Sequence, residues 1–260
     1  MTAVQSSLSG RVALITGCSR RRGIGFATAK RLAESGSDLF LHSFTPYDAT
    51  QPWGADADGI VSIVEELRGL GRRVEFLEAD FMDPESPLRV MRAAVQAFGH
   101  VDILIVNHAY STNGWLEELT AEHIDMHLLV NVRASLLLIK AFSVQHDGRP
   151  GGRVILLTSG QHLGPMPGEL AYIASKGALH QLTQSLSAHL VRRGITVNTV
   201  NPGATDSGWA PAELYQEVLK ANPQGRWGLP EDAARLIAWL ATDDAQWITG
   251  QVINSTGGGD

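Results

Sequence analysis

The sequence has one cysteine, no strong charge of either sign and no long uninterrupted apolar run. The single cysteine, Cys18, excludes an internal disulfide framework and suits a reducing compartment. A net charge of −6 argues against nucleic acid or an anionic membrane as the main partner. No apolar run reaches the ~20 residues of a membrane span, and the N-terminus lacks the basic segment and apolar core of a secretory signal. We therefore expect a cytoplasmic protein with no nucleic-acid and no membrane partner.

The hydrophobic residues, 44% of the 260, occur in short runs that alternate with helical patterns. Seven runs rich in Val, Ile and Leu are typical of strands buried on both faces of a parallel sheet. They span residues 11–16, 38–43, 73–78, 101–107, 152–159, 196–201 and 251–255. Helical patterns fill residues 25–35, 59–70, 86–98, 118–144, 169–193 and 231–241. The alternation predicts one α/β domain over residues 1–260, with a Rossmann-like doubly wound sheet of about seven mostly parallel strands and helices on both faces.

Three segments interrupt this alternation and are predicted to be loops. They are residues 44–58, residues 160–168 and residues 204–228, the last with a short helical pattern at 212–220. Each follows the carboxyl end of a predicted strand, which is where ligands bind in such sheets. We expect loop 204–228 to be a mobile lid that closes over the site. The alternative is a helix docked permanently through Leu214, Tyr215 and Val218.

A glycine-rich turn follows the first predicted strand. The strand ends at Thr16, and Gly17, Gly23 and Gly25 lead into the first helical pattern. Glycine lets the backbone approach a pyrophosphate closely, and the free amides of a helix N-terminus bind such a group. The strand before the turn and the helix after it favour a dinucleotide site over a plain strand–helix turn.

The residues near this turn favour NADP(H) over NAD(H). An acid at the end of the second strand normally holds the ribose hydroxyls of NAD, but Ser43 occupies that position. A 2′-phosphate would be attracted by the guanidinium groups of Arg20, Arg21 and Arg22. At least one of these arginines is expected to be only a solvated surface residue. NAD(H) stays the alternative cofactor.

Tyr172 and Lys176 lie four residues apart in a helical pattern, so their side chains share one face. Ser159 precedes the tyrosine by thirteen residues. A phenol beside an ammonium can transfer a proton near neutral pH if its pKa falls from ~10 to about 7, which needs roughly 4 kcal/mol of phenolate stabilisation. Lys176 and a cationic nicotinamide together could supply it. The plain alternatives are a core tyrosine for Tyr172 and a cap-type hydroxyl for Ser159.

These motifs together resemble the short-chain dehydrogenase/reductase family over essentially the whole chain. That family pairs a TGxxxGxG turn with a YxxxK motif, and the turn is matched by Thr16, Gly17, Gly23 and Gly25. Five residues rather than three separate Gly17 from Gly23, which resembles a ketoreductase subgroup with an arginine-rich turn. The spacing also approaches that of bacterial enoyl-acyl-carrier reductases, although those enzymes have a wider Tyr–Lys spacing and an alanine in place of Gly25.

The resemblance implies roles for residues along the whole chain. The family's catalytic tetrad corresponds in order and spacing to Asn131, Ser159, Tyr172 and Lys176. The family's NNAG segment is matched at Asn107 and Ala109, whereas His108 and Tyr110 depart from it. Ser207 is a candidate donor to the nicotinamide carboxamide, beside Thr205. Cofactor contacts are implied for Gly17, Ser19, Arg20, Arg21, Arg22, Gly23, Ile24, Ser43, Asp80, Phe81, Asn107, Ala109, Tyr172, Lys176, Pro202, Gly203 and Thr205.

The implied chemistry is hydride transfer between the nicotinamide and a carbonyl carbon. Tyr172 would donate its proton to the nascent alkoxide, and Ser159 would donate a hydrogen bond to the same oxygen. Lys176 would lower the Tyr172 pKa and bind the nicotinamide ribose. Asn131, at a helix disruption, would hold a water that links Lys176 to solvent. The last strand, at 251–255, resembles a segment that commonly supports a homotetramer, with a homodimer as the alternative.

We therefore predict an NADP(H)-dependent ketoreductase for a small carbonyl or secondary-alcohol substrate, with 3-oxoacyl thioesters among the candidates. The alternatives are an NAD-dependent dehydrogenase of secondary alcohols or sugars, and a nucleotide-sensing regulator without turnover. No metal site is predicted, because His123 and His127 lack a third ligand. The composition of the predicted loops does not identify the substrate. Candidate pocket residues are His108, Tyr110, His162 and Trp209.

Overall fold

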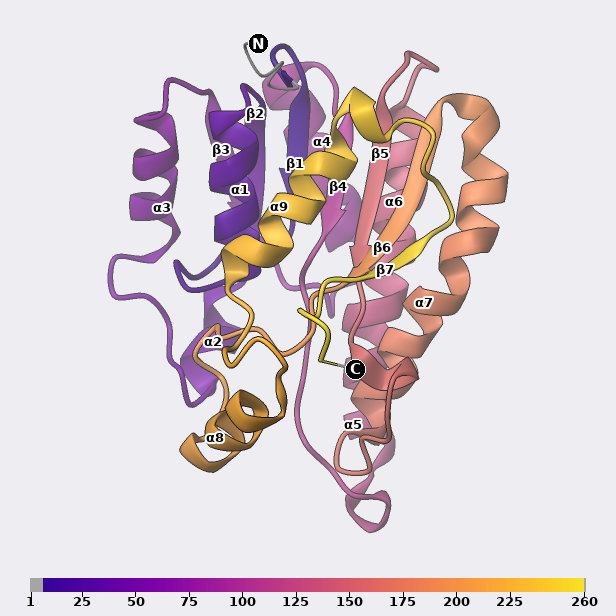
Figure 1. The fold of residues 1–260 in the computed structure, drawn as a ribbon. Helices are drawn as coiled ribbons and strands as arrows, with labels where there is room; N and C mark the ends of the chain where they lie inside the picture. The colour runs from indigo at the N-terminus through magenta and orange to yellow at the C-terminus, as the bar shows by residue number, and fades with distance from the viewer. Residues whose placement is uncertain (1–6, 260) are drawn as a thin grey trace.

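A parallel sheet runs through the part of the chain that the computed structural model describes, residues 7–259 (Figure 1). Its order is β3-β2-β1-β4-β5-β6-β7, and all neighbouring strands are parallel. The strands are β1 (Val12–Ile15), β2 (Asp38–Ser43), β3 (Val74–Glu78), β4 (Ile103–Val106), β5 (Gly152–Leu157), β6 (Ile195–Asn201) and β7 (Val252–Asn254). The predicted doubly wound architecture is confirmed. Strand order reverses between β1 and β4, where ligands bind in such sheets.

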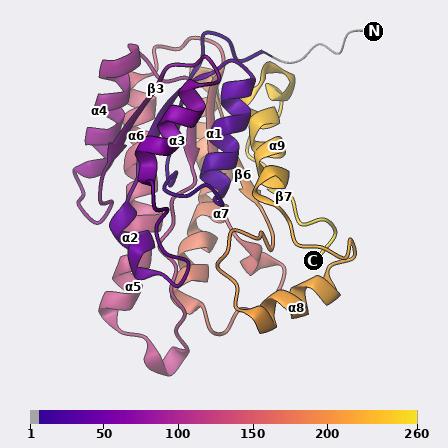
Figure 2. The ribbon, with the colours of Figure 1, turned by 90° about the vertical axis from the view of Figure 1, so that its left-hand side faces the viewer.

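Helices cover both faces of the sheet (Figures 1 and 2). One face carries α1 (Ile24–Glu34), α3 (Gly59–Arg68) and α9 (Pro230–Ala241). The other carries α4 (Ser86–Phe98), α6 (Ala134–Gln145) and α7 (Leu170–Leu190). Three further helices lie beyond the carboxyl ends of the strands, at the bottom of Figure 1: α2 (Thr45–Thr50), α5 (Ala121–His127) and α8 (Ala212–Ala221). Single turns of 3-10 helix are η1 (Leu116–Glu118), η3 (Gly160–His162), η4 (Val191–Arg193) and η5 (Asp243–Ala245).

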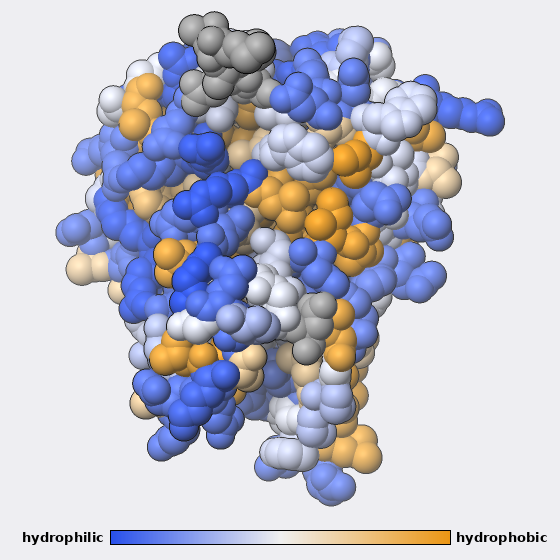
Figure 3. Space-filling view, viewed as in Figure 1, coloured by the Kyte–Doolittle hydropathy of each residue, from blue (hydrophilic) through white to orange (hydrophobic). Residues whose placement is uncertain are grey.

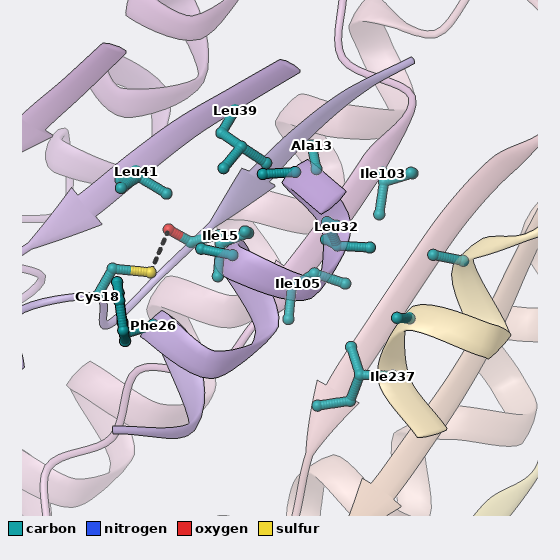
Figure 4. Close-up of a cluster of buried hydrophobic side chains, with 14 of the residues drawn as sticks. Ala13, Ile15, Cys18, Phe26, Leu32, Leu39, Leu41, Ile103, Ile105 and Ile237 are labelled. Carbon is teal, nitrogen blue, oxygen red and sulfur yellow. Dashed lines mark hydrogen bonds between the residues drawn. The ribbon is translucent and has the colours of Figure 1, made fainter. Parts of the chain in front are cut away.

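Each face of the sheet has its own hydrophobic core. Successive strand residues point to opposite faces, so Ala13 and Ile15 of β1 join the core under α1, while Val12 and Leu14 join the core under α4 (Figure 4). This double burial explains why the strands appear as continuous apolar runs. Cys18 lies in the first core, and its thiol donates to the Ile15 carbonyl at 3.7 Å. Burial raises the pKa of the Cys18 thiol, so this residue is no nucleophile.

The helix predicted over residues 118–144 is interrupted. It divides into η1, α5, a π-helical turn η2 (Leu128–Arg133) and α6. The wider π turn displaces the chain by one residue, and Asn131 lies within it, fully buried. The helix disruption expected at Asn131 is therefore present, although a single continuous helix was the wrong prediction.

The helical run Ala121–Gln145 is long and apolar enough, by length and composition, to cross a membrane, which differs from the expectation. Half of its apolar window is buried inside the protein. Leu138 and Phe142 on this run pack in the core under α4 and α6. The run is therefore a core element of the α/β domain.

The segment 44–58, predicted as a loop, contains the helix α2. Pro46 lies in the first turn of this helix, where a missing N–H costs nothing because the first amides of a helix have no partner within it. The proline that indicated a loop is thus a helix-starting residue.

Candidate active site

The glycine-rich turn packs directly against the end of β4. Asn107 Nδ2 donates to the carbonyls of Thr16 and Gly17, at 2.9 and 3.0 Å. A Cβ on Gly17, which has a φ of 73°, would lie 2.9 Å from Asn107 Nδ2. A Cβ on Gly25 would clash with the Gly17 carbonyl and lie 2.8 Å from the same amide. Glycine is required at both positions because two backbones and an amide side chain meet there.

Helix α1 begins at this turn without a side-chain cap. Its N-cap is Gly23, which makes no side-chain hydrogen bond, and its first turn holds no acid. The amides of the first turn, from Ile24 onward, are therefore available to an anionic ligand, which the helix dipole also favours. This cradle of glycines below an uncapped helix fits the pyrophosphate of a dinucleotide.

Two neutral histidines and a phenylalanine support the turn. The rings of His42 and Phe81 stack at 3.9 Å, and His108 meets Phe81 edge-on at 4.5 Å. His42 donates through Nε2 to the Ala79 carbonyl and accepts from the Gly17 N–H through Nδ1. Burial lowers the pKa of His42 to about 4 and that of His108 well below its ordinary value. The Phe81 ring is enclosed, which leaves only its main chain for a cofactor, and His108 is a support and not a pocket residue.

Arg21 and Arg22 of the turn point toward other parts of the protein. Arg21 pairs with Glu66 of α3 at 3.3 Å. Arg22 pairs with Asp206 at 2.8 Å, and its side chain is 66% exposed. Both arginines have an acidic partner, and their contacts to a cofactor stay predictions.

Arg20 is the more enclosed arginine, with a side chain 15% exposed. It pairs with Asp48 of α2 at 3.2 Å, lies 5.0 Å from the centre of the Trp53 ring, and donates to the Ser207 carbonyl at 3.0 Å. Burial lowers the pKa of the Arg20 guanidinium, and the charge of Asp48 partly offsets this. Sequence reasoning missed Asp48 because helix α2 was predicted as loop.

The residues that we expect to contact the adenosine part of the cofactor differ in how accessible they are to it. Ser43 is fully buried, and its hydroxyl has no hydrogen-bond partner within residues 7–259. Ser19 accepts the Phe44 N–H at 3.2 Å, and Asp80 accepts the Met82 N–H at 2.8 Å. A cofactor reaches Ser43 only if the chain that covers it moves, so this contact stays a prediction.

Ser159, Tyr172 and Lys176 meet at the carboxyl end of β5. Ser159 forms a hydrogen bond with the Tyr172 hydroxyl. Lys176 Nζ lies 5.7 Å from the centre of the Tyr172 ring and donates to the Leu157 carbonyl at 3.0 Å. Within residues 7–259 the ammonium has this single protein acceptor, so its two further N–H groups can bind a ligand.

Burial controls the protonation of this group. It raises the pKa of Tyr172 to about 12, against the opposing effect of the Ser159 hydrogen bond, and lowers the pKa of Lys176 to about 8. In the protein alone desolvation of the phenolate dominates, so the lowering of the Tyr172 pKa that we expect from Lys176 and a bound nicotinamide stays a prediction. At neutral pH the phenol is protonated and can act as an acid.

Asn131 fixes the surroundings of Tyr172. Its Oδ1 accepts the Tyr110 N–H at 2.7 Å, and its Nδ2 donates to the Tyr110 carbonyl and to Ser175 Oγ, both at 2.9 Å. Ser175 in turn donates to the Tyr172 carbonyl at 2.7 Å. The Asn131 carbonyl accepts from Ser135 at 2.6 Å. These bonds give Asn131 a positioning role, and its expected water-holding role stays a prediction.

Tyr47 reaches the same region from α2, which the sequence did not indicate. Its hydroxyl donates to the Ser111 carbonyl and accepts the Ser111 N–H, both at 3.1 Å. Its ring lies 5.5 Å from that of Tyr110, which meets His127 at 4.8 Å. Both nitrogens of His127 bond to main-chain groups of His123 and Thr112. The two histidines thus hold a loop, and residues 7–259 contain no cluster of three or more metal-ligating side chains.

The loop after β6 is tied down by aromatic contacts. The Thr205 hydroxyl donates to the Pro202 carbonyl at 3.1 Å, and the Trp209 indole donates to the Thr205 carbonyl at 3.0 Å. Tyr215 of α8 stacks on Trp227 at 5.0 Å. No residue of α8 is buried, although one of its faces is half-buried.

Known proteins are similar to this chain in sequence and in fold. A family model described as enoyl-(acyl carrier protein) reductase matches residues 17–259. The uncharacterized oxidoreductase YjdA of Bacillus subtilis is 42% identical over 250 residues, which cover 95% of this chain and 96% of that protein. A dehydrogenase/reductase from Sinorhizobium meliloti has a TM-score of 0.88 at 35% identity, with 98% of each chain covered. A short chain dehydrogenase from Burkholderia cenocepacia, in complex with NADP, has a TM-score of 0.87 at 34% identity and covers 97% of this chain and 98% of its own.

A Ser–Tyr–Lys group and a glycine cradle on one doubly wound sheet define an oxidoreductase of the Rossmann-like class. The chain belongs to the short-chain dehydrogenase/reductase family, as its motifs predicted.

Replacing Gly25 tests the cradle. We expect Gly25→Ala to weaken NADPH binding at least tenfold, ~1.4 kcal/mol, because the new methyl group collides with the Gly17 carbonyl and displaces α1. Titration calorimetry measures the effect. Gly177→Ala is the control, since a Cβ there has no neighbour within 4 Å. Unchanged affinity in the Gly25 variant would show that the cofactor does not depend on this close approach.

Hydrogen exchange tests the lid. We expect amides of residues 209–222 to exchange fast in the free protein and slowly with NADP+ and a ketone bound, because α8 is too short to be stable alone and buries no residue. The central strand β4 serves as the internal reference. Equal protection in both states would show that the Tyr215–Trp227 stack docks the helix permanently.

Proposed function

We propose that this protein is an NADP(H)-dependent ketoreductase that interconverts a carbonyl compound and a secondary alcohol. The protonated phenol of Tyr172, hydrogen-bonded to Ser159 and beside Lys176, carries the proposal. A bound nicotinamide would supply or accept the hydride. Tyr172 donates its proton to the carbonyl oxygen, and Ser159 donates a hydrogen bond to the same oxygen. Lys176 holds a positive charge at the inner end of the site and binds ribose hydroxyls.

Two features support NADP(H) over NAD(H). The strand end carries Ser43 in place of an acid, and Arg20 lies beside Ser19 in the turn. The Burkholderia cenocepacia protein is described in complex with NADP. The ion pair with Asp48 also orients the Arg20 guanidinium, so a 2′-phosphate would meet a fixed donor.

The spacing between Tyr172 and Lys176 supports the reduction of a ketone. The matching family model is described as an enoyl reductase. However, Tyr172 and Lys176 are four residues apart, whereas bacterial enoyl-acyl-carrier reductases have a wider Tyr–Lys spacing. We infer a carbonyl substrate, with 3-oxoacyl thioesters among the candidates.

An apolar surface supports assembly as a homotetramer or a homodimer. Figure 3 shows apolar side chains gathered between α9 and the sheet edge at β7. Trp239 of α9 and Trp247 before β7 are 39% and 95% exposed, and Ile248 and Ile253 are only partly buried there. Exposed apolar patches of this kind mark interfaces. We place the assembly in the cytoplasm, in keeping with the single, buried cysteine.

The arginine assignment predicts a difference between cofactors. We expect Arg20→Ala to weaken NADPH binding ten- to a hundredfold and to leave NADH binding nearly unchanged, because one charge-assisted phosphate contact contributes ~1.5–3 kcal/mol. Calorimetric titration of both cofactors measures it. Arg21→Ala is the matched control, since Arg21 is directed to α3. Equal affinities of the wild type for NADPH and NADH would contradict the preference itself.

Removing the phenol hydroxyl separates binding from chemistry. Tyr172→Phe should keep NADPH affinity and lose nearly all turnover, because only the transferred proton is removed. Lys176→Ala should weaken both, because it also removes a ribose contact. Turnover is followed by NADPH consumption with a panel of ketones. Retention of more than a few per cent of activity in Tyr172→Phe would require a different acid.

A further inference from the structure

Glu169 carries a half-buried carboxylate without a partner in the described part of the chain. Its main chain is held, with the N–H donating to the Met166 carbonyl at 3.1 Å and the carbonyl accepting from Ile173 at 2.9 Å. Within residues 7–259 its carboxylate takes part in no hydrogen bond and no ion pair. Every other buried or half-buried acid of that range accepts at least one hydrogen bond, as Asp48 does from the Trp53 indole. Because the Glu169 side chain is only half-buried, its unpaired oxygens can be reached by a ligand that donates a hydrogen bond.

Glu169 immediately precedes the helix that carries the catalytic pair. Tyr172 follows it by three residues, within the first turn of that helix. Glu169 is the N-cap of α7, whereas Lys176 is buried one turn beyond the tyrosine. The charge of Glu169 is felt at the phenol, because it raises the pKa of Tyr172. The Glu169 carboxylate is therefore close enough to the phenol to contact a substrate whose carbonyl meets Tyr172.

The surroundings of Glu169 supply no positive charge. Gly114 donates to the Gly168 carbonyl at 2.8 Å, which brings the loop after β4 alongside. The Trp115 ring lies over Gly168 and is 56% exposed. Burial lowers the pKa of His127, so that imidazole is neutral. Burial also raises the pKa of Glu169, and no cation opposes it.

We propose that Glu169 determines substrate choice by binding a hydrogen-bond donor, a hydroxyl or an ammonium group, that lies about one helical turn, ~5–6 Å, from the reacting carbonyl. The substrates would then be polar ketones with a donor on the chain beyond the carbonyl. The inference rests on the proposed ketone reduction at Tyr172 and adds the substrate class. An apolar wall at Trp115 beside an acid suits a short carbon chain that ends in such a donor.

Three methyl ketones of equal length test the proposal, with a hydroxyl, an ammonium or a methyl group at the far end. Their affinity for the NADP+-bound protein is measured by calorimetry, and their kcat/KM is measured with NADPH. In the wild type we expect the two donor ketones to bind about tenfold or more tightly than the methyl one. Glu169→Gln should abolish the preference for ammonium and keep part of that for hydroxyl, because an amide oxygen still accepts. Glu122→Gln, which changes an exposed acid of α5, should leave both the ammonium preference and the hydroxyl preference unchanged.

The two readouts separate this proposal from the proposed reaction. Selective binding of donor ketones without turnover would refute ketone reduction and keep the assignment of Glu169. Turnover of all three with equal affinity in the wild type would overturn the assignment and keep the reaction. A Glu169→Gln variant that still prefers the ammonium ketone would also overturn it. If that variant does not fold, the wild-type ranking of the three ketones decides.

Discussion

The buried hydroxyl of Thr16 joins the two halves of the site. It accepts the main-chain N–H groups of Asn107 and His108, at 3.0 and 3.2 Å, and donates to His108 Nδ1 at 2.8 Å. The end of β1, which opens the phosphate turn, is thereby fixed to the end of β4, which opens the loop that Asn131 clamps at Tyr110. Because Thr16 is fully buried, water does not compete for these bonds. Together with the Asn107 bonds to the Thr16 and Gly17 carbonyls, this junction fixes the glycine cradle relative to the loop beside the catalytic phenol.

Burial sets the chemistry of the catalytic group more strongly than its charged neighbour does. The phenol of Tyr172 has its pKa raised to about 12, although Lys176 lies close by. Desolvation lowers the pKa of Lys176 to about 8, so its ammonium form is less strongly favoured and stabilises the Tyr172 phenolate less. The protein alone is therefore poised as a proton donor, and a second positive charge is needed before the phenol can serve as a base.

Features with a fixed spacing were predictable from the sequence, and contacts between distant segments were not. The strands followed from doubly buried apolar runs, the cradle from Gly17 and Gly25, and the catalytic face from the step between Tyr172 and Lys176. No spacing indicates that Asp48 pairs with Arg20, because this requires a helix in a segment predicted as loop.

Two other features of the site that the sequence did not predict have different causes. The enclosure of the Phe81 ring depends on His42 and His108, which approach from two other strand ends. Glu169 did have a signal, its three-residue step to Tyr172, but the importance of that step appears only once its carboxylate is seen to lack a partner.

The arginines of the turn also bind the loop after β6, through the Arg22–Asp206 ion pair and the Arg20 bond to the Ser207 carbonyl. A guanidinium engaged with the loop has fewer donors left for a phosphate, so the two partners compete for the same groups. By thermodynamic linkage, a phosphate that displaces these two bonds frees the chain at Asp206 and Ser207, and the same two bonds oppose phosphate binding by an equal free energy. The affinity of the turn for a phosphate and the attachment of the loop at these two residues are therefore coupled to each other.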